Sequence, residues 1–389
     1  MMKKNYGKIL KDNINKERML FFYAFISYNR VRKNVNEVKL ELTALNAILM
    51  ILTTFVASII LVPIFKKVAF HIGAVDEPNK RRLNKVAMPT IGGVAVFLSF
   101  LLGYMIFMNP SKEMNAILIA SFIILLTGFI DDIKPISAKY QLLGQLAAIC
   151  TLVFYGNITI DVFTIPNITM NLAFPWNSLV TIIFMIGIIN AIDLSDGMDG
   201  LSSGISIIYF VTILIIASII GTLGNLDSSI AILMIGALLG FLVYNFPPAK
   251  IYIGDSGSNF MGLMVATTAI CGYKLATFTS LIVPLAILAT PIIDVVFSII
   301  RRSLKKENPF TTPDKEHLHH QLLKLKFSTK TSLMIIYSIN LLFSAVSILY
   351  VLNYIEYALI LYVLLMILFL FIVLKTDIVF PHRKDKKNE

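Results

Sequence analysis

Apolar runs long enough to cross a bilayer recur along this chain from residue 43 to residue 375. A helix needs about 17–25 apolar residues to span the hydrocarbon core, where its backbone polar groups must be satisfied within the helix itself. The candidate spans are 43–65, 91–109, 115–130, 141–156, 177–192, 201–221, 229–246, 260–277, 280–300, 331–352 and 355–375. Several are shorter than ideal, and a different division of the region 260–300 is the alternative there. We therefore expect an all-α polytopic membrane protein, a bundle of about 10–11 transmembrane helices.

The composition supports the same fold class and excludes some partners. Hydrophobic residues make up 57% of the chain and charged residues only 15%, whereas soluble domains carry about a quarter charged residues. The net charge of +11 is concentrated in a few loops, without a regular alternation of aromatic and basic residues and without a nucleic-acid-binding motif. We therefore expect no nucleic-acid partner. Cys150 and Cys271 lie in apolar stretches and are expected to be small buried hydrophobic residues.

The distribution of lysine and arginine predicts the orientation in the membrane. The basic loops are 66–90, 131–140, 248–259 and 301–330. The nearly uncharged loops between them are 109–115, 157–176, 222–228 and 353–356. By the positive-inside rule the basic loops are cytoplasmic. Every acidic cluster described below then falls on the cytoplasmic side, so we expect one shared active site made of cytoplasmic loops.

Two segments flank the predicted membrane domain 43–375, and one loop lies within it; none of the three carries predicted chemistry. Residues 1–42 contain ten lysines or arginines, yet this orientation places them outside the cytoplasm. An interfacial basic segment, a disordered tail and a start codon placed too early remain open for them. Residues 376–389 are predicted to form a charged cytoplasmic tail. The β-branched alternation in 157–176 favours a small external hairpin, with an irregular loop as the alternative.

Carboxylates stand where the predicted spans end. They are Asp131 with Asp132, Asp193 with Asp196 and Asp199, Asp255, and Asp294. Acids near hydrocarbon are costly and tend to mark function. Asp131 and Asp132 repel each other unless a cation or proton lies between them, and they oppose the dipole at a helix C-terminus. Asp193, Asp196 and Asp199 recur every three residues and share one face on a helical path. Both groups favour metal or phosphate chemistry over a solvated helix end.

A glycine- and serine-rich motif surrounds Asp255. Small residues and backbone N–H groups at a helix start suit phosphate, and Asp255 offers an oxygen ligand to Mg²⁺. A simple helix cap is an equally good interpretation. Asp294 lies within the predicted span 280–300 and is expected either to face the site or to bond a neighbouring helix.

A histidine-rich segment closes the last basic loop. It contains His317, His319 and His320, three of the five histidines in the chain. His317 and His320 are three residues apart and would share a helical face. Zinc is less suited here because the nearby acids favour a hard, oxygen-seeking cation. Imidazoles that contact a diphosphate together with Arg301 and Arg302 fit better, and a solvated charged loop is the alternative.

Taken together, these motifs resemble the polyprenyl-phosphate N-acetylhexosamine-1-phosphate transferase family, which is glycosyltransferase family 4. The resemblance covers about 70 to 380, nearly the whole membrane domain. The motifs that carry it are Asp76-x-Pro-x-x-Arg81, Pro89-x-x-Gly-Gly93, Asp131-Asp132, Asn190 through Leu201, Gly254-Asp255-Ser-Gly-Ser258, Arg301-Arg302, Pro309-Phe310 and His317-Leu-His-His320. Each motif is modestly specific, whereas their order on alternate helix ends is highly specific.

Details of the motifs indicate a branch of the family and two departures from it. The Arg-Arg, Pro-Phe and His-x-His-His pattern resembles the branch that uses UDP-N-acetylglucosamine, whereas the UDP-MurNAc-pentapeptide branch usually has three consecutive histidines. The family's Asn-x-x-Asn is Asn190-x-x-Asp193 here, and a common loop histidine is Asn84. Both departures bear on the sugar specificity.

The resemblance implies transfer of N-acetylglucosamine 1-phosphate from UDP-N-acetylglucosamine to undecaprenyl phosphate, with release of UMP. It implies Mg²⁺ as cofactor, with Mn²⁺ as the alternative ion, held by Asp255 and supported by Asp196. Asp131 or Asp132 would accept the proton of the lipid phosphate or position it, so the expected catalytic residues are Asp131, Asp132 and Asp255. A two-step route through an aspartyl-phosphate is the alternative to direct transfer. The implied substrate-binding residues are Arg81, Lys139, Asn190, Asp193, Asp196, Asp199, Arg301, Arg302, His317, His319 and His320.

The resemblance also implies a setting and leaves alternatives. The setting is the bacterial plasma membrane, with a multi-pass chain, a cytoplasmic active site and the lipid bilayer as partner. The product would start a cell-wall glycan such as teichoic acid, and a homodimer is left open. Another UDP-aminosugar, including UDP-MurNAc-pentapeptide, is the main alternative donor. A secondary transporter is the rival class, but transporters tend to place acids near the bilayer midplane in repeated halves.

Overall fold

Helices make up nearly all of the computed structural model, which describes residues 44–77, 87–165, 168–274, 282–304 and 317–375. The helices are α2 (Ala44–Ile72), α3 (Gly92–Phe107), α4 (Lys112–Ile133), α5 (Ala138–Cys150) with a following π-helical turn η1 (Thr151–Tyr155), α6 (Trp176–Leu194), α7 (Leu201–Ile220), α8 (Leu226–Asn245), α9 (Gly254–Lys274), α10 (Ile282–Ile287), α11 (Ala289–Leu304), α12 (Leu318–Lys324), α13 (Thr329–Val351) and α14 (Ile355–Lys375). The strands are β1 (Val75–Asp76), β2 (Met88–Pro89), β3 (Val162–Ile165) and β4 (Ile168–Asn171).

The helices agree with the predicted membrane fold. In the described part of the chain, six helices are long and apolar enough to cross a membrane, namely α2, α4, α6, α7, α8 and α13. The helices α3 and α14 are also apolar but shorter over their described residues. The protein is therefore an all-α polytopic membrane protein, as predicted. The number of spans, about 10–11 by the length rule, stays a prediction.

The structure divides the predicted span 280–300 into α10 and α11, within the region 260–300 whose division the sequence left open. Pro291 explains the division, since proline has no N–H to donate to the carbonyl of Ile287, where α10 ends. The neighbouring helical bonds continue from Leu288 N–H to the Pro284 carbonyl at 3.1 Å and from Ile292 N–H to the Leu288 carbonyl at 3.1 Å. The break gives α11 its own direction, and Asp294 is carried on this second piece.

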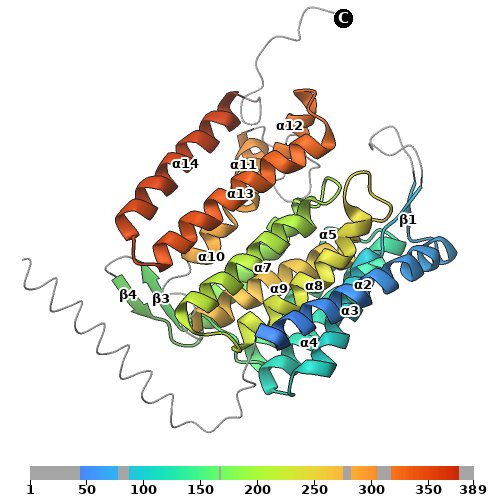
Figure 1. Ribbon diagram of the computed structural model, residues 1–389, viewed down its shortest axis with the longest axis horizontal. Helices are drawn as coiled ribbons and strands as arrows, with labels where there is room; N and C mark the ends of the chain where they lie inside the picture. The colour runs from blue at the N-terminus through green and yellow to red at the C-terminus, as the bar shows by residue number, and fades with distance from the viewer. Residues whose placement is uncertain (1–43, 78–86, 166–167, 275–281, 305–316, 376–389) are drawn as a thin grey trace, which may run out of the picture. The chain divides into compact units, whose positions relative to one another are not determined.

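Two short antiparallel pairs of strands decorate the helices. The strands β3 and β4 pair from Val162 with Asn171 to Ile165 with Ile168, which confirms the predicted hairpin. The strands β1 and β2 pair Val75 with Pro89. In Figure 1 the β3–β4 hairpin lies at one end of the helices, whereas β1 and α12 lie toward the other end.

The core of the bundle is built from α2, α3, α4, α6, α7, α8 and α9, which pack against one another. The helix α8 is the most enclosed of the candidate spans, with 78% of its most apolar window buried, against 28% for α2. This difference places α8 inside the bundle and leaves one side of α2 for lipid. The pair α13 and α14 joins the bundle through contacts of α13 with α7.

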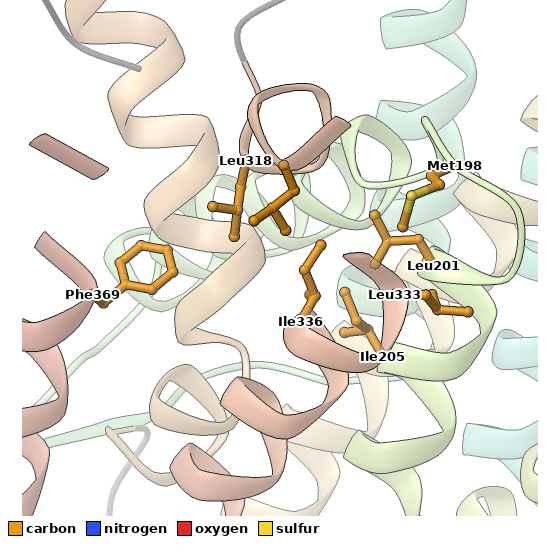
Figure 2. Packing of buried hydrophobic residues seen from close by; sticks show 8 residues of the cluster. Met198, Leu201, Ile205, Leu318, Leu333, Ile336 and Phe369 are labelled. Atoms are coloured by element: carbon orange, nitrogen blue, oxygen red, sulfur yellow. The ribbon is translucent and has the colours of Figure 1, made fainter. Parts of the chain in front are cut away.

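A buried cluster fixes α12 to the bundle (Figure 2). Leu318 and Leu322 of α12 pack with Leu201 and Ile205 of α7 and with Ile336 of α13. All five side chains are at most 5% exposed. Burying each such aliphatic side chain contributes about 1.5–3 kcal/mol. The short helix that carries the histidines is thereby held by apolar packing next to the start of α7.

Candidate active site

Asp132 of α4 holds the start of α9. Its two carboxylate oxygens accept the backbone N–H groups of Asp255 at 2.9 Å and Ser256 at 3.1 Å. Gly254 has a φ of +70°, and a Cβ there would stand 2.5 Å from Oδ1 of Asp132. The expectation that this helix start offers its N–H groups to phosphate is therefore wrong for these two donors. The acid is favoured here because it lies at the positive end of α9, which offsets its unfavourable place at the end of α4.

Asp131 and Asp255 face each other across the same junction. Their carboxyl groups lie within hydrogen-bonding reach. Oδ2 of Asp255 also accepts from Nε2 of Gln141 at 3.1 Å, and Oδ1 of Asp131 accepts the Ile136 N–H at 2.7 Å. Two such carboxylates repel unless a proton or cation lies between them. The pair therefore suits a hard cation, which prefers carboxylate oxygens.

The described residues do not form a complete metal cage. No three His, Cys, Asp or Glu side chains within the described ranges gather closely enough to hold an ion. Mg²⁺ commonly binds through one or two carboxylates and completes its octahedron with water and substrate phosphates. The pair Asp131 and Asp255 fits that pattern, in which the protein supplies only part of the ligand set.

Asp193 in the last turn of α6 and the loop acids Asp196 and Asp199 do not lie on one helical path, so the predicted shared helical face is wrong. The helix α6 ends at Leu194, and Asp196 and Asp199 lie in the loop 195–200. The left-handed φ of +75° at Gly200 keeps this loop from continuing as a helix. The three acids consequently reach different partners.

Each of these acids is engaged by a different segment. Ser258 donates to Oδ1 of Asp193, and Ser202 donates to Oδ1 of Asp196. The Ala249 N–H donates to Oδ2 of Asp199 at 2.9 Å. Asp193 is therefore tied to α9, Asp196 to α7 and Asp199 to the segment before α9. The loop is fixed on three sides by its own carboxylates.

Burial changes the protonation of Asp196. It raises the pKa of this carboxyl well above its usual range, and the negative charges of Asp193, Asp132 and Asp199 raise it further against the hydrogen bond from Ser202. A cation beside the group would oppose this shift, because it favours the ionised form. The supporting role of Asp196 toward a metal, which the resemblance implies, stays a prediction.

A relay of amides links α5, α6 and α9 behind the acids. Asn190 donates from Nδ2 to Oε1 of Gln145 at 3.1 Å, and Gln145 donates from Nε2 to Oδ1 of Asn259 at 2.8 Å. Asn259 then donates to Oδ1 of Asp193 at 3.2 Å. The sequence analysis missed Gln141, Gln145 and Asn259. The signal that could have found the first two is a pair of glutamines four residues apart in an apolar run, which share one helix face.

We expect Gln145→Leu to destabilise the protein by about 1–3 kcal/mol, because it leaves the half-buried amide of Asn190 and the buried amide of Asn259 without this partner. Denaturant unfolding of the purified protein in detergent measures the loss. Leu143→Ala on the same helix is the control, since Leu143 is 53% exposed. Equal stability of Gln145→Leu and the wild type would show that the relay does not support the fold.

The histidine segment meets the acidic loop at one residue. His319 is 2% exposed, and its Nε2 makes no hydrogen bond to the described residues. A Cβ on Gly197 would collide with this Nε2, so the ring lies directly against the loop between Asp196 and Met198. Burial lowers the pKa of His319 to about 3, and His320 adds to the effect. His319 is therefore neutral at neutral pH, held against the acids without an ion pair.

The remaining predicted substrate-binding residues are the basic residues of the site. Arg301 and Arg302 lie in the last turn of α11 and are 2% and 8% exposed, which is unusual for arginine. Lys139 is exposed in the first turn of α5. Arg81 lies outside the described residues. The structure thus brings the acids and His319 together, and it leaves the roles of these cations as predictions.

The structure is an all-α membrane bundle with carboxylates from several helix ends at one junction, and the comparisons place it among membrane-embedded transferases. The chain belongs to glycosyl transferase family 4, whose profile matches residues 114–273. This confirms the predicted family.

Relatives support the assignment over most of the chain. The probable undecaprenyl-phosphate N-acetylglucosaminyl 1-phosphate transferase of Bacillus subtilis is 38% identical over 301 residues, 76% of this chain and 83% of the relative. The undecaprenyl-phosphate alpha-N-acetylglucosaminyl 1-phosphate transferase of Thermotoga maritima is 30% identical, covering 69% and 79%. The phospho-N-acetylmuramoyl-pentapeptide-transferase of Staphylococcus carnosus is 31% identical, covering 58% and 74%.

Proposed function

We propose that the protein transfers N-acetylglucosamine 1-phosphate from UDP-N-acetylglucosamine to undecaprenyl phosphate and releases UMP. The observation that carries the proposal is the convergence of Asp131, Asp193 and Asp255 at one junction of α4, α6 and α9. Phosphoryl transfer depends mainly on positioning the reactants and on neutralising their charge. In a chain of this transferase family, a junction of carboxylates from three helices could serve both purposes.

The reaction forms one bond and breaks one bond. An oxygen of the lipid phosphate attacks the phosphorus that carries the sugar, and the bond from that phosphorus to the bridging oxygen of UMP breaks. The lipid phosphate has a second pKa of about 6, so it needs little help to lose its proton at neutral pH. Asp131 is better placed than Asp132 to position it, because Asp132 uses both oxygens to hold α9.

Asp255, with Asp196 in support, would hold the divalent ion. Bound Mg²⁺, or Mn²⁺ as the alternative, would supply charge neutralisation on the diphosphate oxygens. Arg301, Arg302 and the histidines are proposed to bind the diphosphate end of the donor. Lys139 is proposed to bind the same diphosphate. Asn190, Asp193 and Asp199 are proposed to shape the nucleotide-sugar side of the site, and the amide relay would keep Asn190 in place.

The setting follows the same proposal. The site faces the cytoplasm because the acids adjoin basic loops, and the product begins an envelope glycan such as teichoic acid. The relatives from Bacillus subtilis and Thermotoga maritima carry names for N-acetylglucosaminyl 1-phosphate transfer. The relative from Staphylococcus carnosus is named for the muramoyl-pentapeptide donor, which keeps that donor as the second candidate. Membership in a transferase family sets the transporter alternative aside.

UMP release by the purified protein in detergent, with undecaprenyl phosphate and Mg²⁺, tests the proposal. UDP-N-acetylglucosamine, UDP-MurNAc-pentapeptide and other UDP-aminosugars are compared as donors. Release with the first donor alone is the expected result. Release only with another donor would keep the reaction and overturn the branch, whereas folded protein that releases no UMP with any donor would overturn the reaction.

A further inference from the structure

Asp294 of α11 binds the segment that carries the histidines. Its Oδ2 accepts from Nδ1 of His317 at 2.9 Å, and its Oδ1 accepts the Leu318 N–H at 3.0 Å. The side chains of His317 and Asp294 are only 6% and 12% exposed. One buried carboxylate therefore holds both the ring of His317 and the first backbone N–H of α12.

The pairing fixes which nitrogen of His317 carries the proton. An ionised carboxylate only accepts hydrogen bonds, so the proton lies on Nδ1 and points to Asp294. Nε2 is then the nitrogen left for a ligand, and it makes no hydrogen bond to the described residues. A carboxylate behind an imidazole sets its tautomer and its direction.

A second imidazole ring, that of His319, connects His317 with the acidic loop. The rings of His317 and His319 are nearly parallel, with an interplanar angle of 2° and centroids 5.8 Å apart. His319 in turn lies against Gly197, next to Asp196. A small cavity between α7, α11, α12 and α13 has Asp294, His319 and Ser195 among its lining residues. Asp294 thus holds the histidine segment, whose His319 lies against the acidic loop.

We propose that Asp294 is a positioning residue of the phosphotransfer site: it holds His317 as the Nδ1–H tautomer, so that Nε2 is offered to the phosphates of the nucleotide sugar. The inference rests on the proposed function for the identity of the ligand. The tautomer itself is a property of the resting protein and can be measured without turnover.

Asp294→Asn separates positioning from folding. The Asn oxygen can still accept the Leu318 N–H, whereas its NH₂ group can only donate to His317. Nδ1 must then become the acceptor, and the proton moves to Nε2. We expect normal folding and kcat/KM for UMP release about 10- to 100-fold lower, the usual effect of losing the partner that orients a functional histidine. Asp294→Glu, which keeps the carboxylate, is expected to retain more activity than Asp294→Asn.

Two measurements decide the inference. ¹⁵N NMR of histidine-labelled protein, with His317 assigned by the signal lost in His317→Ala, should show protonated Nδ1 in the wild type and protonated Nε2 in Asp294→Asn. In the His317→Ala background, Asp294→Asn should cause no further loss of activity.

Other results would overturn the inference. These are an unchanged tautomer in Asp294→Asn, full activity of that variant, or an equal further loss in the His317→Ala background. If the wild type releases no UMP with any donor, the proposed function fails, and the NMR result still decides whether Asp294 sets the tautomer.

Discussion

Asp255→Asn is expected to lower UMP release by at least about a hundredfold, the scale of removing one preorganised electrostatic contact from an active site. The substitution preserves the size of the side chain, and the amide oxygen can still accept from Gln141. What is lost is one of the two carboxylates that face each other at the junction of α4 and α9. The loss therefore reports charge at the site rather than packing.

The same substitution should separate metal binding from folding. Without divalent ions the variant is expected to melt at least as high as the wild type, because repulsion between Asp131 and Asp255 is relieved. Mg²⁺ should raise the Tm of the wild type by mass action and leave the variant unchanged. Thermal unfolding in EDTA and in Mg²⁺ measures both effects independently of activity.

A matched acid provides the control for this prediction. Glu113 lies in the first turn of α4, at the other end of the helix from Asp131, and is exposed. Glu113→Gln removes the same charge and should leave activity and the response to Mg²⁺ at wild-type values. An Asp255→Asn protein that keeps wild-type UMP release, or still gains stability from Mg²⁺, would place the ion elsewhere.

The fold and the polar helix ends could be predicted because hydrocarbon leaves few solutions. Span length and the cost of charge in lipid restrict a chain of this kind to helices with acids at their ends. The run 115–130 accordingly became the core of α4, with Asp131 and Asp132 in its last turn. The break at Pro291 was missed because the length rule counts apolar residues and does not weigh the missing N–H of proline.

The partners of the acids could not be predicted in the same way. Gln141 meets Asp255 and Gln145 meets Asn259 across 114 residues of chain in both cases. Such pairs depend on how α5 packs near α9, and no local sequence pattern predicts this packing. Asp294 was expected either to face the site or to bond a neighbouring helix, and its partner proved to be His317, 23 residues away. The sequence shows which polar side chains are costly to place near hydrocarbon, and the packing of the helices determines which partners satisfy their hydrogen bonds.

Gly128→Ala is expected to reduce activity about a hundredfold or more, although the substitution adds a single methyl group. Gly128 lies one turn before Asp131 and Asp132 on α4, where the helix touches the backbone at the start of α9. A Cβ there would stand 2.5 Å from both the carbonyl carbon and the carbonyl oxygen of Asp255. Non-bonded carbons prefer about 3.5–4.0 Å, so α9 has to shift by about 1 Å, a misplacement that costs about 10²-fold in catalysis.

Gly128→Ala is expected to change the geometry of the junction between α4 and α9 more than it impairs folding. Overpacking of this kind costs about 1–3 kcal/mol, which many proteins tolerate because their stability is about 5–15 kcal/mol. The shift, however, pulls the N–H groups of Asp255 and Ser256 away from Asp132 and changes the spacing between Asp131 and Asp255. UMP release is therefore compared per mole of monodisperse protein, with Tm measured on the same sample.

Gly187→Ala on α6 is the matched control, because no atom lies within 4 Å of a Cβ at that position. Alanine favours a helix over glycine by up to about 1 kcal/mol, so this variant should be fully active and at least as stable as the wild type. Loss of activity in Gly128→Ala alone would tie catalysis to the contact between α4 and α9. Wild-type activity in Gly128→Ala would mean that the junction adapts to the extra methyl group, and that the spacing of its carboxylates is not what limits the reaction.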